Sequence, residues 1–257
     1  MSNNTPLLLG HRGAKKYAPE NTLAAFNLAL EQGADGVELD AKLSADGVVV
    51  VHHDVTVDRT TNGKGKLSQL PLAVLRELDA GSFFSDKFRG EKIPTLDEVF
   101  ESIGKRSVIN VELTNYSTPR DSLVEKVCEL VRRHALQKRI IFSSFFAGNL
   151  KKAAAFLPDV PRGLLTQVSV LGLWARSFGF NFGDYAALHP YLTDVTAQQV
   201  QRVHKLKRKI NVWTVNTEAD IRRLIGWGVD GLITDDPALA VRVARGRFDF
   251  AQREASV

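Results

Sequence analysis

The chain has 257 residues, 44% of them hydrophobic and 25% charged, and a formal net charge of +5. These proportions are ordinary for a soluble globular protein, so they argue against intrinsic disorder and against membrane residence. The positive charge mildly favours anionic ligands, but Lys and Arg are scattered without a stripe of basic and aromatic residues, which argues against nucleic acid binding.

The amino terminus and the cysteine content bear on the cellular compartment. The opening sequence MSNNTPLLLGHRG has no basic region and only a short apolar run, so we expect no signal peptide and no stable membrane anchor. Cys128 is the single cysteine, so no internal disulfide can form. Both features are compatible with the reducing cytoplasm, which is the location we expect.

The first part of the chain follows a strand, helix, strand pattern. Residues 7–10 form a short apolar run that ends in the sequence HRG, as in a strand that delivers polar groups at its carboxyl end. Asn21 or Thr22 can cap a helix whose apolar residues recur at helical spacing until Gly33. A second strand from Gly36 would complete a βαβ unit.

Residues 36–54 predict a β-hairpin that carries acidic side chains. Glu38 and Asp40 are separated by one residue in a β-rich run, so their carboxylates point to the same face. A polar turn with Gly47 interrupts the apolar pattern, and residues 48–51 resume it.

The register of this hairpin decides which histidine joins the acids. If residues 44 and 47 face each other, His53 lies opposite Glu38, whereas a one-residue slip would place His52 there. Either pairing predicts two carboxylates and an imidazole close together.

Residues 55–92 form a long excursion with one modest helical stretch, at 71–78. Such a segment is typical of an active-site lid or a small inserted subdomain. Phe83 and Phe84 within it would either wall a pocket or pack the insertion onto the rest of the protein, and the sequence favours neither.

The remainder of the chain alternates between strand and helix patterns. Strands are expected at 108–113, 139–145, 162–166, 185–188, 210–215 and 231–234. Helices are expected at 94–103, 119–134, 147–156, 168–178, 197–206, 218–227 and 237–245. With the strands at 7–10 and 37–39, this pattern predicts an α/β fold, a (β/α)8 TIM barrel over residues 1–257 with a small insertion after strand two at about 55–92.

Polar residues at the carboxyl ends of barrel strands line the active site. Residues expected there are His11, Arg12, Glu38, Asp40 and Glu112. Three carboxylates without a nearby cysteine favour Mg²⁺ or Ca²⁺ over structural zinc. Glu112 alone, inside an apolar strand, would suit a salt bridge equally well, but the convergence of two further acids favours a metal.

Two histidines are candidate proton carriers. They are His11 and His53, since an imidazole titrates near neutral pH and can act as acid or base. Arg12 together with a divalent cation would clamp an anionic phosphoryl group. His189, at the end of a predicted strand, is expected at the edge of the pocket.

These motifs together resemble the glycerophosphodiester phosphodiesterase family. The matching stretches are His11-Arg12-Gly13, Pro19-Glu20-Asn21-Thr22, residues 36–40, His53-Asp54, residues 93–96, residues 111–113 and Ile233-Thr234-Asp235. They run in order over nearly the whole chain. The resemblance implies a barrel with an insertion after strand two, a divalent cation, and hydrolysis of glycerophosphodiesters to glycerol 3-phosphate and an alcohol.

The resemblance also implies residue roles. Glu38, Asp40 and Glu112 would be the metal ligands. His11 and His53 would be the acid-base pair, without an assignment of which is the acid and which the base. Arg12 would contact the phosphate, and the aromatic residues Phe145 and Trp213 would surround the glycerol moiety. The two aromatic residues would serve equally well as plain barrel core. Water or the substrate's own glycerol hydroxyl would be the nucleophile.

The chain departs from the family at Thr114, where a lysine often follows the third carboxylate by two positions. One cationic phosphate contact is therefore missing or supplied from elsewhere. Two alternatives stay open, a lysophospholipase D-like enzyme acting on lysolipids and a non-catalytic barrel that binds phosphodiesters. The expected partner is a small-molecule substrate, and the sequence does not indicate an oligomeric state.

Overall fold

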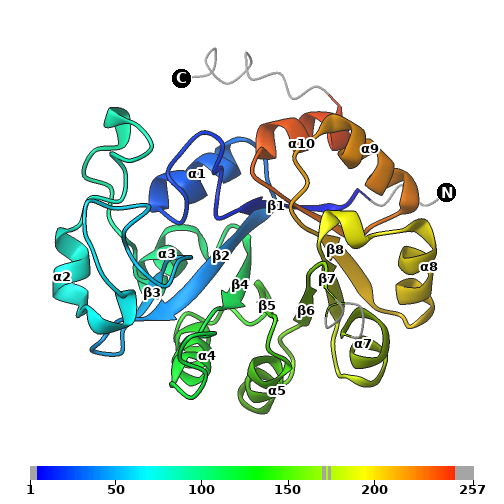
Figure 1. Cartoon of the computed structure of the whole chain (residues 1–257). Helices are drawn as coiled ribbons and strands as arrows, with labels where there is room; N and C mark the ends of the chain where they lie inside the picture. The colour runs from blue at the N-terminus through cyan, green and yellow to red at the C-terminus, as the bar shows by residue number, and fades with distance from the viewer. Residues whose placement is uncertain (1–4, 170–171, 173–174, 247–257) are drawn as a thin grey trace.

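The computed structural model describes residues 5–246, apart from 170–171 and 173–174, and these residues form a closed parallel β-barrel surrounded by helices (Figure 1). The barrel strands are β1 (Leu7–His11), β2 (Gly36–Leu43), β4 (Val108–Leu113), β5 (Ile140–Ser144), β6 (Arg162–Thr166), β7 (Ala187–Pro190), β8 (Lys209–Val212) and β9 (Gly231–Thr234). Strand β1 pairs in parallel with both β2 and β9, which closes the sheet. The predicted TIM barrel is confirmed.

The described helices differ in how they begin, and five of the nine start at a side chain that caps a free amide group. They are α1 (Leu23–Glu31), α2 (Leu72–Glu77), α3 (Leu96–Ile103), α4 (Leu123–Arg133), α5 (Ala147–Phe156), α7 (Phe180–Phe182), α8 (Ala197–Lys205), α9 (Glu218–Trp227) and α10 (Pro237–Arg245). Thr22 caps α1, and Thr95 and Glu98 form a reciprocal capping box on α3. Helix α9 ends at Gly228, whose φ of 81° suits a residue without a Cβ atom.

The hairpin of β2 with β3 (Val49–Val51) forms, but its register differs by one residue from the prediction. Leu43 pairs with Val49, because the turn runs from Ser44 to Val48 instead of ending at Gly47. The predicted pairing of residues 44 and 47, and with it the placement of a histidine opposite Glu38, was therefore wrong. Gly47 does relieve the bend, with a φ of 76°.

The hairpin continues into the loop that holds both histidines. The His52 amide donates to the Asp40 carbonyl oxygen over 2.9 Å, and the His52 side chain turns to the Thr56 carbonyl oxygen at 3.0 Å. His53 reaches the carboxyl ends of the strands from this loop and not through strand pairing.

The segment between β3 and α3 is an insertion with its own small hydrophobic cluster. It contains η1 (Leu67–Gln69), α2 and η2 (Asp86–Phe88). Val57, Leu67 and Leu75 pack with Val50 of β3, separately from the main core between the strands and the helices. The insertion, drawn in cyan and teal, lies beside the barrel (Figure 1).

Two predicted helices differ most from the structure. Helix α4 begins at Leu123 instead of residue 119, after a short turn. The helix predicted at 168–178 falls partly on 170–171 and 173–174, outside the described residues. In its place the described residues form a π-helical segment, η3 (Ala175–Gly179), followed by α7.

Candidate active site

A cavity of about 750 Å³ opens at the carboxyl ends of the barrel strands. Of the predicted site residues, those lining it are His11, Arg12, Glu38, His53, Glu112, Phe145 and Trp213. Asp40 lies directly behind them, buried on β2. The structure thus brings the predicted metal-ligating, acid-base, phosphate-contacting and aromatic residues to one place.

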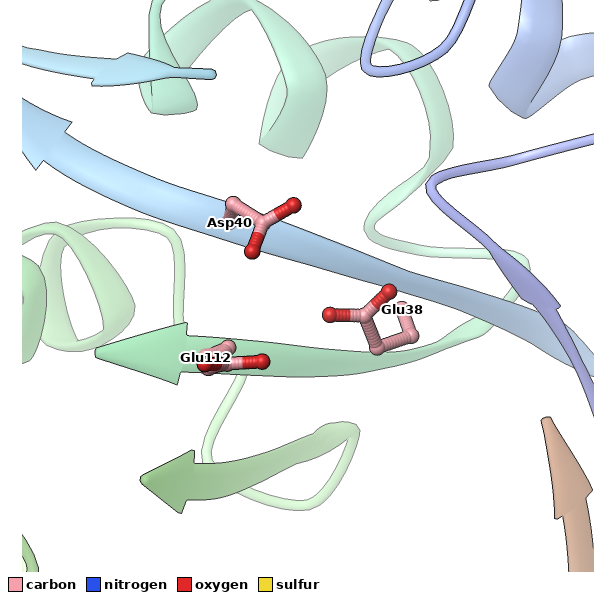
Figure 2. A group of neighbouring side chains, drawn as sticks. All are labelled: Glu38, Asp40 and Glu112. Atoms are coloured by element: carbon pink, nitrogen blue, oxygen red, sulfur yellow. The ribbon is translucent and has the colours of Figure 1, made fainter. Parts of the chain in front are cut away.

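Three carboxylates converge from two adjacent strands. Glu38 and Asp40 project from the same face of β2 toward Glu112 on β4, which pairs directly with Asp40 (Figure 2). One oxygen of each carboxylate lies within 4.8 Å of the others. Alternation along β2 and the parallel register with β4 together produce this arrangement.

The charges of this cluster are poorly balanced. Burial, followed by repulsion from the neighbouring carboxylates, raises the pKa of Glu38 well above its ordinary value. The same two causes raise the pKa of Glu112 to about 8. Although burial opposes it, the Arg12 guanidinium holds the pKa of Asp40 below its usual range.

The donor set fits a hard divalent cation. Oxygen ligands on opposite sides of Mg²⁺ or Ca²⁺ are separated by about 4–5 Å, since each lies about 2.0–2.6 Å from the ion. The three carboxylate oxygens all lie within 4.8 Å of one another, close enough to share one such ion. A cation would also relieve the mutual repulsion that raises the pKa of Glu38 and Glu112.

His11 is held by an acid from the last strand of the barrel. Its Nδ1 lies 2.6 Å from Asp235 Oδ1, just after β9, and its Nε2 lies 3.9 Å from Glu38 Oε2. Burial lowers the pKa of His11, while the Asp235 carboxylate opposes this shift. The contact with Asp235 fixes the imidazole and leaves Nε2 toward the cavity.

His53 has an equivalent partner in its neighbour. Its Nδ1 lies 2.6 Å from Asp54 Oδ1, and Arg59 of the insertion binds the other oxygen of Asp54 at 2.7 Å. Arg59 also donates to both oxygens of Glu20, at 2.7 and 2.9 Å. Sequence reasoning named Asp54, Glu20 and Asp235 within matching motifs without giving them roles, and it missed Arg59.

Arg12 links these pairs to the acidic cluster. Its guanidinium donates to Glu20 over 2.8 Å and lies 3.3 Å from Asp40 Oδ2. Its amide donates to Glu38 Oε2 over 3.1 Å, from a left-handed backbone with φ of 54°. The Asn21 amide group also donates to Asp40 Oδ2, at 2.9 Å. The acidic cluster is thus fixed before any ligand binds.

Lys42 follows Asp40 by two residues and also lines the cavity. Its ammonium donates to the carbonyl oxygen and the hydroxyl oxygen of Thr114, each over 3.0 Å. Burial lowers the pKa of Lys42, while Asp40 and Glu112 oppose this shift. Sequence reasoning missed Lys42, although its place in the alternation after Glu38 and Asp40 was a usable signal.

The opposite side of the cavity is aromatic. Phe145, just after β5, lies edge to face with Trp213, just after β8, with ring centroids 5.7 Å apart. Tyr116 contacts Phe145 at 5.9 Å and donates its hydroxyl to Glu112 Oε1 over 2.8 Å. Phe145 and Trp213 are therefore half-buried cavity walls and not plain core.

His189 does not lie at the edge of the cavity, so that prediction was wrong. Its side chain is fully buried inside the barrel, where Asn211 Nδ2 lies 2.9 Å from its Nε2. Burial lowers the pKa of His189 to about 4, so the imidazole is neutral at physiological pH. It points inward because it sits within β7 and not beyond the strand end.

Phe83 and Phe84 do not line the cavity either. They meet edge to face on the insertion, with ring centroids 6.5 Å apart, and both stay exposed. Of the two alternatives for these residues, the structure therefore does not support the one in which they wall the pocket. Across the part of the chain that the structure describes, every helix is too short or too polar to cross a lipid bilayer.

Comparisons with known proteins agree with this geometry. Residues 11–239 match the model of the glycerophosphoryl diester phosphodiesterase family. A glycerophosphodiester phosphodiesterase of Caldanaerobacter subterraneus subsp. tengcongensis is 40% identical over 240 residues, which cover 93% of this chain and 98% of that relative.

Solved structures of phosphodiesterases are also similar to this chain. A phosphodiesterase of Oleispira antarctica, in complex with the product sn-glycerol-3-phosphate, has a TM-score of 0.86 and 33% identity over 93% of this chain and 96% of that one. A putative glycerophosphoryl diester phosphodiesterase of Silicibacter pomeroyi has a TM-score of 0.84 and 27% identity, covering 94% of this chain and 93% of that one.

Proposed function

Because the chain belongs to the glycerophosphoryl diester phosphodiesterase family, we propose that it hydrolyses glycerophosphodiesters to glycerol 3-phosphate and an alcohol in a metal-dependent reaction. One observation carries this proposal. Three carboxylates and two acid-supported imidazoles face one cavity at the strand ends of the barrel.

Glu38, Asp40 and Glu112 would hold the divalent cation, Mg²⁺ or Ca²⁺. When bound, the cation supplies charge neutralisation and Lewis-acid polarisation of the phosphoryl group. The chain itself contributes Arg12, whose guanidinium is already fixed by Glu20 and offers its remaining N–H groups to a phosphate oxygen.

His11 and His53 would move the protons. Each imidazole is held at Nδ1 by a carboxylate, Asp235 or Asp54, so each presents Nε2 as the exchanging nitrogen. One histidine removes the proton of the attacking oxygen as its bond to phosphorus forms. The other protonates the alkoxide as the ester bond to phosphorus breaks. The attacking oxygen belongs to water or to the glycerol hydroxyl of the substrate.

Phe145 and Trp213 would enclose the glycerol part of the substrate. Their rings form an apolar wall opposite the acidic cluster, and they contact each other edge to face. A substrate with its phosphate on the acidic side would thus have its carbon chain against the aromatic side.

The proposal is tested by measuring glycerol 3-phosphate release from glycerophosphocholine and glycerophosphoethanolamine with Mg²⁺, Ca²⁺ or EDTA. We expect metal-dependent turnover that His11→Ala and Glu38→Ala abolish. His204→Ala is the matched control, because His204 is also paired to an acid, Asp230 at 2.8 Å, but lies outside the cavity lining.

Two results would contradict the proposal. Turnover of a lysolipid, with both soluble diesters inert under every metal condition, would identify a lysophospholipase D-like enzyme. Diester binding without cleavage would identify a non-catalytic barrel.

A further inference from the structure

Lys42 is a cavity-lining cation that is held in place by neutral groups. The described residues offer its ammonium two oxygen acceptors, both from Thr114 at 3.0 Å, and no carboxylate within ion-pair distance. An ammonium has three donors, so one N–H remains for another partner. Burial of a cation without a direct counter-ion is costly, and an anion that approaches the cation offsets this cost.

The position of Lys42 is built by both strands of the acidic cluster. Glu38, Asp40 and Lys42 occupy alternate residues of β2, so their side chains leave the same face of the strand. Thr114 directly follows β4, and its own hydroxyl donates to the Ala41 carbonyl oxygen over 2.7 Å. That hydrogen bond orients the hydroxyl oxygen as an acceptor for the ammonium.

Arg12 differs from Lys42 in its partners. The Arg12 guanidinium contacts Glu20 at 2.8 Å and Asp40 at 3.3 Å, so two carboxylates already compensate its charge. Asp40, Glu112 and Asp54 attract the Lys42 ammonium only from farther away. The charge of Lys42 is therefore less compensated than that of Arg12, so Lys42 is the better placed of the two to attract an incoming anion.

We propose that Lys42 binds an anionic oxygen of the phosphodiester substrate and of its phosphate-monoester product, and that Thr114 is the residue that positions its ammonium. This inference rests on the proposed function for the class of substrate. It adds a cation on the side of the cavity next to the acidic cluster, supplied by β2, so that the phosphate is held between the metal ligands and Lys42.

The test is calorimetric titration of sn-glycerol 3-phosphate and inorganic phosphate into the full chain at a fixed Mg²⁺ concentration. Loss of one charge-assisted contact weakens binding by about 10- to 100-fold, which is the increase in Kd expected for Lys42→Met. Lys42→Arg should keep most of the affinity, because it keeps the charge.

Lys126→Met is the matched control for loss of a lysine. Lys126 also donates to a backbone carbonyl, that of Gly47, but it lies outside the cavity that contains Lys42. Its Kd for both anions should equal that of the wild type.

Thr114→Val tests the positioning role. The backbone acceptor remains and the hydroxyl is lost, so Kd should rise by about 3- to 10-fold, and Thr114→Ser should restore it. Equal affinities for the Val and Ser variants and the wild type would leave Thr114 without a positioning role.

The remaining outcomes separate this inference from the proposed function. If the wild type cleaves diesters but Lys42→Met binds both anions unchanged, the inference is overturned and the function stands. If no diester is cleaved, yet Lys42→Met loses phosphate binding, the anion contact stands and the substrate class fails. A Lys42→Met variant that melts earlier with unchanged anion affinity would show that Lys42 only balances the carboxylates.

Discussion

The two sides of the cavity are built in different ways. The side formed by β1, β2 and β4 is charged, and its groups are tied together by ion pairs that reach Asp40, Glu20 and Arg59. The side formed after β5 and β8 is aromatic, and its rings contact one another through their edges. Fixed charges act on a reacting phosphate, whereas an apolar wall contributes contact area.

This difference separates chemistry from substrate binding. Arg12 and Lys42 are proposed to contact the phosphate and should affect binding, whereas the other groups on the charged side should affect kcat, because they are arranged before substrate arrives. Groups on the aromatic side should affect KM, because they would contact parts of the proposed substrate that do not react. Tyr116 is the link between the two sides, since it donates to Glu112 and contacts Phe145.

The largest effect is expected for Glu112→Gln. Removal of one charge from the proposed metal site should lower kcat/KM by at least about 1,000-fold. The same change removes a repelled, buried charge, so the metal-free variant should melt at a higher temperature than the metal-free wild type. Steady-state kinetics and thermal unfolding in EDTA check the two effects, and retained turnover would exclude Glu112 as a ligand.

Asp235→Asn should have the next largest effect. Without its carboxylate partner at 2.6 Å the His11 imidazole loses its fixed tautomer, and kcat should fall by about 100-fold with KM little changed. Asp236→Asn is the control, because Asn can still accept from the Leu239 amide and cap α10. Equal kcat values for the two variants would contradict a role for Asp235 in orienting His11.

Glu20→Gln should alter stability in a pH-dependent way. Burial opposes the shift, but hydrogen bonds and ion pairs with Arg59 and Arg12 lower the pKa of Glu20 from 4.5 to about 2. A lowered acid pKa stabilises the fold above pH 4.5, and this contribution is lost as the pH falls through about 2. The free energy of unfolding of the wild type should therefore be higher than that of the variant by about 3 kcal/mol at pH 7.

Urea unfolding at several pH values measures this difference. The two proteins should converge in free energy of unfolding as the pH falls from 4.5 toward 2. A constant difference across that range would show that Glu20 acts through packing and not through its charge.

The smallest effect is expected for Trp213→Leu, on the aromatic side. Loss of ring contact with the substrate should raise KM by about 5- to 10-fold and leave kcat nearly unchanged. Trp227→Leu, on the outer helix α9, is the control. If Trp213→Leu lowered kcat as much as Asp235→Asn does, the expected separation of kcat effects on the charged side from KM effects on the aromatic side would be contradicted.

The charged side was predictable from sequence where it depends on local geometry. The one-residue spacing of Glu38 and Asp40 fixes their common face, and the apolar surroundings of Glu112 indicate a special role. The hairpin register was not predictable, because the extra turn residue at Val48 depends on hydrogen bonds of the Ser44 side chain. The TIM barrel followed from the alternation of strands and helices.

Contacts between distant segments account for the rest. Arg59 binds Glu20, which lies 39 residues earlier in the chain, and no local sequence pattern predicts that pair. The inward direction of the His189 side chain could not be predicted, because the sequence pattern did not show where β7 ends. Lys42 was overlooked for a different reason, since a lysine on a strand is usually a solvent-exposed residue.

Barrel closure also sets the moment at which a newly made chain can work. His11 and its partner Asp235 are 224 residues apart, so translation produces the imidazole early and its carboxylate late. A nascent chain that stops before β9 has an open sheet and an unsupported His11. We therefore expect full turnover only after residue 235 has been added and has docked, once synthesis has passed the strand that closes the barrel.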